Sequence, residues 1–86
     1  MAGGVAQFMY FTYVLRSKTD SKLYIGYTTN LKNRLYEHLT GKVESTKSRL
    51  PVELVYYEAC LDKYKAMQRE KYFKTGFGRK YLHSRI

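Results

Sequence analysis

Two runs of aromatic and β-branched residues, separated by a short turn, constrain the fold of this sequence more than any other feature. Residues 9–17 read MYFTYVLRS and residues 22–27 read KLYIGY, a composition typical of β-strands. Between them, KTDS supplies turn-forming side chains, so we predict that the two runs pair as an antiparallel hairpin. Such a pairing makes Tyr13 and Tyr24 direct or diagonal cross-strand neighbours.

A helix is predicted directly after the hairpin. Residues 28–30 are Thr-Thr-Asn, all candidate N-caps for a helix over 31–40. Gly41 is a suitable residue to end it. Leucines recur at spacings of four and are predicted to form the buried stripe of this helix: Leu31, Leu35 and Leu39.

The second half of the chain returns to the sheet. The predicted elements are a polar, basic loop over 41–51, a strand over 52–60, a helix over 63–75 and a short final helix within 78–86. Asp62 is the expected cap of the third of these, and Gly76 its expected end. The order predicts an α+β domain, in which helices pack on a small antiparallel sheet.

Size and cysteine content set the outer limits. Eighty-six residues make one domain, near the lower end of what folds on a hydrophobic core alone. We assign residues 9–86 to that domain and residues 1–8 to a flexible N-terminal arm or a remnant of cloning. The lone Cys60 excludes an intrachain disulfide and fits a reducing compartment, so we expect a cytoplasmic protein. No apolar run approaches the roughly 20 residues that span a bilayer, and no membrane association is expected.

The charge balance points to a polyanionic partner. Sixteen Lys and Arg face seven Asp and Glu, and ten tyrosines and four phenylalanines accompany them. Cations meet phosphates and aromatic rings stack on bases, so the composition favours nucleic acid as the partner. The alternative is that the tyrosines mainly build the core of a small basic protein. A membrane surface is disfavoured because the positive charge is spread along the chain.

Two polar residues of the first predicted helix stand out. Arg34 and His38 lie one turn apart and share a face. That face borders the leucine stripe, so both side chains are expected at the margin of the core, beside the sheet. One interpretation is a functional site; the other is an arginine whose aliphatic stem only covers apolar surface.

Glu70 is the most unusual residue of the second helix. It falls within the arc that should face inward, between Ala66, Met67 and Phe73. A carboxylate is rarely buried without a partner, so Glu70 either pairs with a lysine or holds a divalent cation in a cleft. Glu58, by contrast, alternates with apolar neighbours and is predicted to face solvent.

Taken together, five positions form a recognisable order. Tyr13, then Tyr24 in the run Tyr-Ile-Gly, then Arg34, His38 and a late helical Glu70 resemble the GIY-YIG nuclease superfamily over roughly residues 9 to 80. The pattern is most similar to small stand-alone bacterial members, which resemble the N-terminal nuclease domain of the bacterial excision-repair nuclease. The first motif is degenerate, since Phe-Thr-Tyr stands where the family has Gly-Ile-Tyr. A late asparagine of several members has no match within 71–86.

This resemblance implies a three-stranded antiparallel sheet flanked by helices and a metal-dependent hydrolysis of phosphodiester bonds. The implied roles are general base or water orientation for Tyr13, tuning or proton relay for Tyr24 and His38, transition-state stabilisation for Arg34, and binding of Mg²⁺ or Mn²⁺ for Glu70. Tyr13 and His38 can share the role of base, and the sequence does not assign the proton between them. Lys47 and Arg49, in the basic loop, are predicted phosphate contacts.

Three functions follow from these expectations. The first is a metal-dependent DNA endonuclease, structure-directed or weakly sequence-specific because no element for reading the major groove is evident. The second is a nucleic-acid-binding module of the same fold with little or no catalytic activity. The third is a nuclease component that works only with protein partners or as a homodimer.

Overall fold

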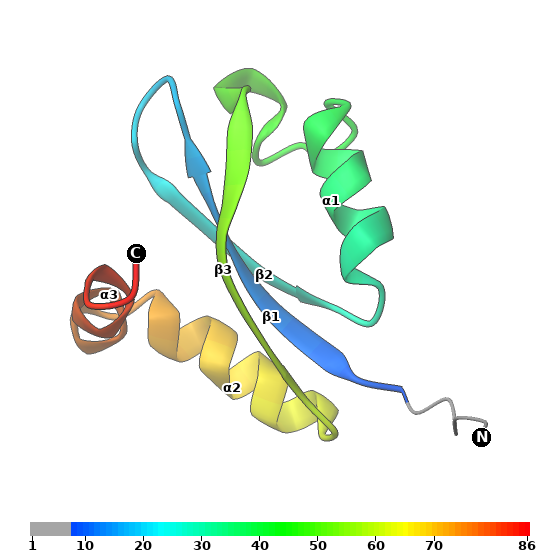
Figure 1. Cartoon of the computed structure of the whole chain (residues 1–86), viewed down its shortest axis with the longest axis vertical. Helices are drawn as coiled ribbons and strands as arrows, with labels where there is room; N and C mark the ends of the chain where they lie inside the picture. The colour runs from blue at the N-terminus through cyan, green and yellow to red at the C-terminus, as the bar shows by residue number, and fades with distance from the viewer. Residues whose placement is uncertain (1–7) are drawn as a thin grey trace.

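The computed structural model describes residues 8–86 and shows one antiparallel sheet with helices on both faces (Figure 1). Residues 1–7, most of the predicted N-terminal arm, lie outside the described residues. The strands run in the order β2-β1-β3, so the predicted α+β class with a three-stranded antiparallel sheet is confirmed. In chain order, the elements are β1 (Tyr10–Ser17), β2 (Leu23–Thr28), α1 (Leu31–Leu39), the 3₁₀ turn η1 (Lys47–Arg49), β3 (Val52–Cys60), α2 (Lys63–Phe73) and α3 (Gly76–His83).

The hairpin register places the two motif tyrosines as expected. Tyr13 pairs with Gly26, and Leu15 pairs with Tyr24. Tyr13 and Tyr24 are therefore diagonal neighbours on one face of the sheet, because residues two apart on a strand point the same way. The cross-strand prediction is confirmed in its diagonal form.

Alternate residues of the central strand β1 supply two separate cores. On the face under α1, Tyr13 and Leu15 pack with Val52. On the face under α2 and α3, Val14 packs with Phe73 and Leu82 (Figure 1). Each core alone is small, so both helical layers are needed to bury the sheet.

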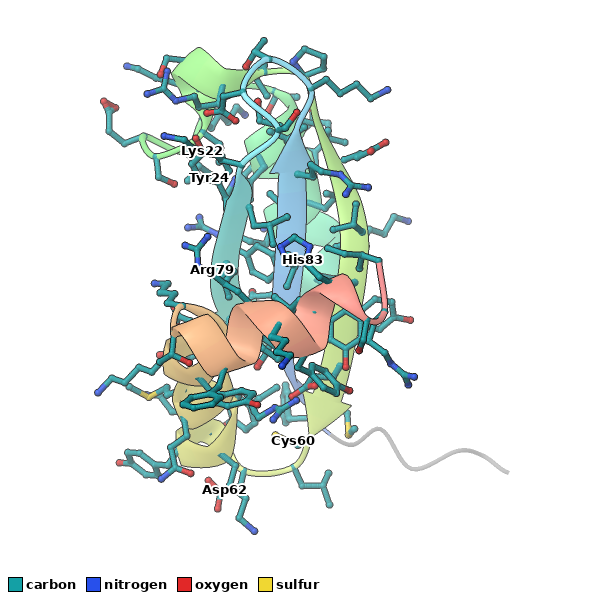
Figure 2. All side chains as sticks on the ribbon, turned by 90° about the vertical axis from the view of Figure 1, so that its left-hand side faces the viewer. Lys22, Tyr24, Cys60, Asp62, Arg79 and His83 are labelled. Atoms are coloured by element: carbon teal, nitrogen blue, oxygen red, sulfur yellow. The ribbon has the colours of Figure 1, made fainter. Side chains whose placement is uncertain are left out.

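The helices begin at the predicted caps. The Asn30 side chain accepts a hydrogen bond from the backbone N–H of Asn33 at 3.0 Å. Asp62 accepts from two backbone N–H groups at the start of α2 (Figure 2). The predicted helix over 63–75 ends earlier, at Phe73, because Thr75 caps a new helix that begins at Gly76. No helix within residues 8–86 is long and apolar enough to cross a membrane.

Two predictions of side-chain burial are wrong. Leu39 is 50% exposed, whereas His38 is buried. The inward face of α1 follows the i, i+4, i+7 spacing of Leu31, Leu35 and His38, so a histidine takes the last buried position and Leu39 is rotated away.

Glu58 also departs from its prediction as a solvent-facing residue. Arg69 of α2 donates to both of its carboxylate oxygens, at 2.6 and 3.0 Å. The same guanidinium lies 4.6 Å from the ring centroid of Phe73 and 5.4 Å from that of Tyr81. Glu58 faces α2 across the sheet surface, and the ion pair helps to fix that helix.

Candidate active site

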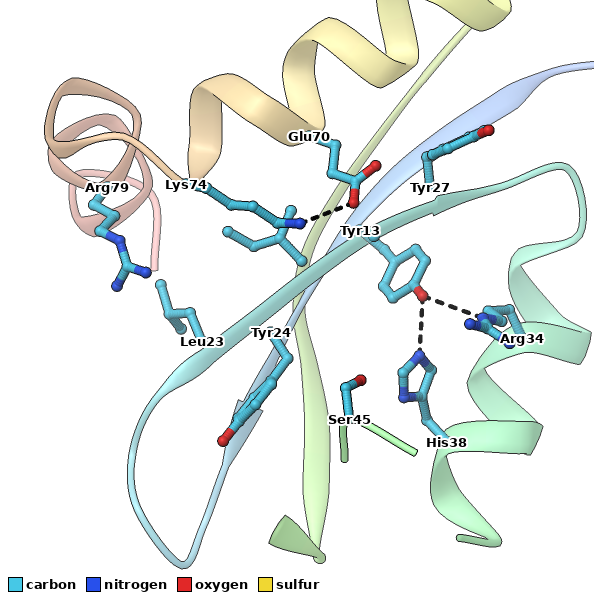
Figure 3. Close-up of a pocket in the computed structure, with 12 residues that line it drawn as sticks. Tyr13, Leu23, Tyr24, Tyr27, Arg34, His38, Ser45, Glu70, Lys74 and Arg79 are labelled. Carbon is cyan, nitrogen blue, oxygen red and sulfur yellow. Dashed lines mark hydrogen bonds and ion pairs between the residues drawn. The ribbon is translucent and has the colours of Figure 1, made fainter. Parts of the chain in front are cut away.

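The hydroxyl of Tyr13 is the centre of a buried polar cluster. It lies 2.9 Å from His38 Nε2 and accepts a hydrogen bond from Arg34 Nε at 3.4 Å (Figure 3). The Tyr13 side chain comes from the middle of β1, whereas Arg34 and His38 come from successive turns of α1. The predicted cluster at the strand-to-helix margin is thereby formed, with the phenol and imidazole rings edge-on to each other.

Gly26 makes room for this tyrosine. A Cβ atom at this position would stand 2.5 Å from Tyr13 Oη and 2.7 Å from Cζ. Any larger residue in β2 would therefore collide with the Tyr13 ring. The glycine of the Tyr-Ile-Gly run thus has a steric role, which is to let Tyr13 lie across β2 and reach α1.

His38 is held from both sides of its ring. Its Nδ1 lies 2.7 Å from the hydroxyl of Thr46, in the segment between α1 and η1. Burial, together with the positive charge of Arg34, lowers the pKa of His38 below its ordinary value. The imidazole is therefore neutral at pH 7 and carries a single ring proton.

Arg34 is the cationic member of the cluster. The hydrogen bond to Tyr13 and the ion pair with Glu37, at 3.1 Å, raise the pKa of Arg34. The guanidinium is fixed in a charged form beside the phenol oxygen. This is a suitable position for stabilising charge that develops on a phosphoryl group.

These residues line a cleft of about 490 Å³ that straddles the edge strand β2. On the far side of β2 from His38, Glu70 of α2 faces the cleft and forms an ion pair with Lys74 at 3.0 Å (Figure 3). Arg79 of α3 lines the same side (Figures 2 and 3). Both interpretations of Glu70 from the sequence therefore describe part of its position: it pairs with a lysine, and it lies in a cleft.

The carboxylate set limits how a metal would be held. Within residues 8–86, no three His, Cys, Asp or Glu side chains converge on one point. Glu70 is the acidic residue among those that line the cleft. A single carboxylate with water and substrate phosphate oxygens is a set that Mg²⁺ accepts, so the donor chemistry fits Mg²⁺ or Mn²⁺ bound together with substrate.

Tyr24 occupies a different position from Tyr13. Its hydroxyl donates to Asp20 Oδ2 at 2.8 Å and accepts from Arg49 Nε at 3.1 Å. The bond to Asp20 raises the pKa of Tyr24, and a bond from the backbone N–H of Lys22 lowers that of Asp20. The ring of Tyr24 lines the cleft, but its hydroxyl is directed away from Tyr13 (Figure 3).

The two predicted phosphate contacts lie outside the lining of the cleft. Lys47 is paired with Glu44 at 3.2 Å, and Arg49 is paired with Asp20 at 3.3 Å. Arg49 thus joins the η1 segment to the hairpin turn and supports Tyr24. Its place in the structure is that of a tether as well as a surface cation.

Several residues of the site were missed from the sequence: Tyr27, Ser45, Thr46, Lys74 and Arg79. Lys74 follows Glu70 by four residues on one helix, a spacing that signals an ion pair. Thr46 gave no comparable signal, because its loop has no periodicity and its partner His38 is brought to it only by the tertiary fold.

Comparison with known proteins agrees with this geometry. Residues 9–82 match the model of the GIY-YIG catalytic domain. A UPF0213 protein of Streptococcus agalactiae is 49% identical over 65 residues, which cover 74% of this chain and 73% of the relative. A UPF0213 protein of Bacillus pumilus is 46% identical over 67 residues, which cover 77% and 67%, respectively.

A solved structure supports the same assignment. The solution NMR structure of a UPF0213 protein from Bacillus halodurans is similar with a TM-score of 0.56 and 33% sequence identity, covering 88% of this chain and 83% of that one. It shares the α+β architecture of a three-stranded antiparallel sheet with helices. The family resemblance inferred from the motif residues is therefore confirmed at the level of the superfamily, and this chain belongs to the GIY-YIG family.

Proposed function

We propose that this protein is an endonuclease that hydrolyses phosphodiester bonds in DNA with the help of a divalent metal ion. The observation that carries the proposal is the hydrogen-bonded set of Tyr13, His38 and Arg34 in a cleft that also contains Glu70. The family supports nuclease-type chemistry in general. The site supplies groups for each requirement of hydrolysis: a base, a fixed cation and a metal-binding carboxylate.

The roles follow from position. Tyr13 faces the cleft with its oxygen and is suited to orient or deprotonate an attacking water. Arg34, charged and bound to the same oxygen, is suited to stabilise negative charge on the phosphoryl oxygens. His38 holds Tyr13 in place. Tyr24, whose hydroxyl bonds Asp20 and Arg49, shapes the cleft with its ring.

Glu70 is the residue that would hold Mg²⁺ or Mn²⁺. The bound ion supplies positive charge to the phosphate oxygens and so lowers the cost of the transition state. Lys74, which now neutralises Glu70, would be released toward the substrate. Together with Arg79, which has no acidic partner within 4 Å among residues 8–86, it offers a second phosphate contact on the far side of β2.

DNA is the proposed substrate because the chain carries a net charge of +9 and the cleft has cationic groups on both sides of β2. The domain presents no element suited to base reading in the major groove, so branched or nicked DNA is preferred over a defined sequence. We also propose a role in genome maintenance, since the order of the motif residues resembles that of excision-repair nuclease domains. A binding module without cleavage is the second candidate, favoured by the presence of only one carboxylate in the cleft.

The test compares wild type with Glu70→Ala on branched, nicked and linear DNA, with and without Mg²⁺ or Mn²⁺. Cleavage that requires metal and is lost in the variant supports the proposal. Metal-dependent cleavage that survives in Glu70→Ala would refute the assignment of the metal-binding residue. Tight, salt-sensitive binding without any cleavage by wild type would favour the binding module.

A further inference from the structure

A buried threonine lies behind the catalytic cluster. Thr46 is completely buried, and the residues that line the cleft do not include it. Its backbone is already engaged, since its N–H donates to Val43 and its carbonyl accepts from Arg49. Its hydroxyl makes one hydrogen bond within residues 8–86, to His38 Nδ1 at 2.7 Å. A buried hydroxyl with a single partner restricts where the protons of that partner can lie.

Two proton arrangements are compatible with these distances. In the first, Nδ1 of His38 carries the ring proton and donates it to Thr46. The hydroxyl proton of Thr46 then has no acceptor among residues 8–86, and a buried donor without a partner costs about 1–3 kcal/mol.

In the second arrangement, Thr46 donates its proton to Nδ1, and the ring proton lies on Nε2. His38 then donates to the Tyr13 oxygen, and every buried donor of the cluster has an acceptor. The proton of Tyr13 itself is directed into the cleft, where solvent can accept it. The second arrangement therefore leaves no buried proton without a partner.

We propose that Thr46 is a positioning residue that fixes His38 in the Nε2–H tautomer, so that His38 donates to Tyr13 and Tyr13 alone is the proton acceptor of the reaction. The inference rests on the proposed nuclease function for its catalytic consequence, but the tautomer itself does not depend on it. It resolves a question that the sequence left open, which is whether Tyr13 or His38 serves as base.

The chemical consequence concerns the charge on Tyr13. Its oxygen receives hydrogen bonds from Arg34 Nε and His38 Nε2, and two donors stabilise negative charge on a phenol oxygen. Tyr13 first loses its proton through the cleft to solvent. The anion then takes a proton from the attacking water while the water oxygen bonds to phosphorus and the bond from phosphorus to the leaving oxygen breaks.

The first experiment reads the tautomer directly. Long-range ¹H–¹⁵N NMR of the folded protein distinguishes the protonated ring nitrogen from the bare one, and no substrate is needed. We expect the proton of His38 on Nε2 in wild type and in Thr46→Ser, which keeps the hydroxyl. In Thr46→Val, which has nearly the same shape without the donor, we expect a shift toward the Nδ1–H form.

The same spectra contain their own control and the contrary outcome. His83, exposed in α3, should show one unchanged pattern in all three proteins. A proton on Nδ1 of His38 in wild type would overturn the inference, as would an unchanged Nε2–H tautomer in folded Thr46→Val. If Thr46→Val fails to fold, the wild-type and Thr46→Ser spectra still decide the question.

The second experiment tests the role in catalysis. The side-chain amide of Gln donates a hydrogen bond but does not accept a proton as a base. We expect His38→Gln to retain at least tenfold more kcat than His38→Ala, and Thr46→Ser to retain more than Thr46→Val. Equal inactivity of the two His38 variants, both folded, would contradict the donor role. If wild type cuts no DNA, the proposed function fails, and the NMR result alone decides the inference.

Discussion

Replacing Gly26 by alanine should disable the site while leaving the domain folded. The added Cβ would stand 2.5 Å from Tyr13 Oη, whereas ordinary contacts begin near 3.4 Å. Tyr13 is 4% exposed and enclosed by its neighbours, so its ring has to move by about 1 Å to relieve the collision, and displacements of this size near reacting groups cost on the order of 10²-fold in rate. The hydrogen bonds to His38 and Arg34 should be lost or lengthened.

The cost in stability should be smaller. Overpacking costs about 1–3 kcal/mol, and weakened hydrogen bonds add about 1 kcal/mol. Replacement of a strand glycine by alanine recovers roughly 0.5–1 kcal/mol. The free energy of unfolding should therefore fall by about 1–3 kcal/mol, and Tm should fall by about 4–8 °C for each kcal/mol in a domain of this size.

The assay pairs single-turnover DNA cleavage with thermal unfolding. Gly76→Ala is the matched control, because a Cβ at Gly76 meets nothing within 4 Å, and it should keep both kcat and Tm. Wild-type kcat in Gly26→Ala would show that Tyr13 tolerates the displacement and that its position is not critical. A complete loss of folding would show instead that the sheet cannot accommodate the shift, which would refute the expectation of a folded but inactive protein.

Three further predictions concern charge. Arg34→Ala should lower kcat at least tenfold with little change in DNA affinity, measured by single-turnover kinetics and fluorescence anisotropy; an unchanged kcat would remove Arg34 from the mechanism. Arg69→Met should lower the free energy of unfolding by about 1–2 kcal/mol through loss of the Glu58 pair, while cleavage at a temperature where the variant is folded stays at the wild-type rate. Because burial lowers the pKa of His38 in the folded state, the unfolded chain binds its proton more readily, so stability should decline as pH falls below about 6.5. This decline should be smaller in His38→Gln, as followed by urea unfolding between pH 8 and pH 5.

The fold could be predicted from local patterns. The hairpin, the caps at Asn30 and Asp62 and the return strand all depend on residues close together in the sequence, and the structure has them as expected. Leu39 was assigned to the core wrongly because a leucine repeat of four drifts around a helix, and the seam passes to His38 instead.

The site was predictable only in part. Tyr13, Arg34 and His38 meet as the motif order implies. Thr46, however, belongs to an irregular loop, and contacts between a loop and a helix depend on the whole fold. The direction of the Tyr24 hydroxyl depends likewise on Asp20 and on a distant arginine, and neither has a signal in the spacing of residues.

The paired alternation of the sheet explains how so small a domain builds a cleft. β1 buries Tyr13 on one face and Val14 on the other, and the cleft wraps around the neighbouring edge strand β2. Groups from α1 and from α2 therefore approach one substrate from opposite sides of a single strand. The arrangement lets the base and the metal-binding carboxylate act together without direct contact between their helices.

The most direct test of the central claim is single-turnover cleavage of branched DNA by Tyr13→Phe in the presence of Mg²⁺. Phenylalanine keeps the ring that packs with Leu15 and Val52 and removes only the hydroxyl shared by His38 and Arg34. The account predicts a folded protein with wild-type DNA affinity and a cleavage rate reduced by at least 10²-fold. Cleavage at the wild-type rate by Tyr13→Phe would contradict it.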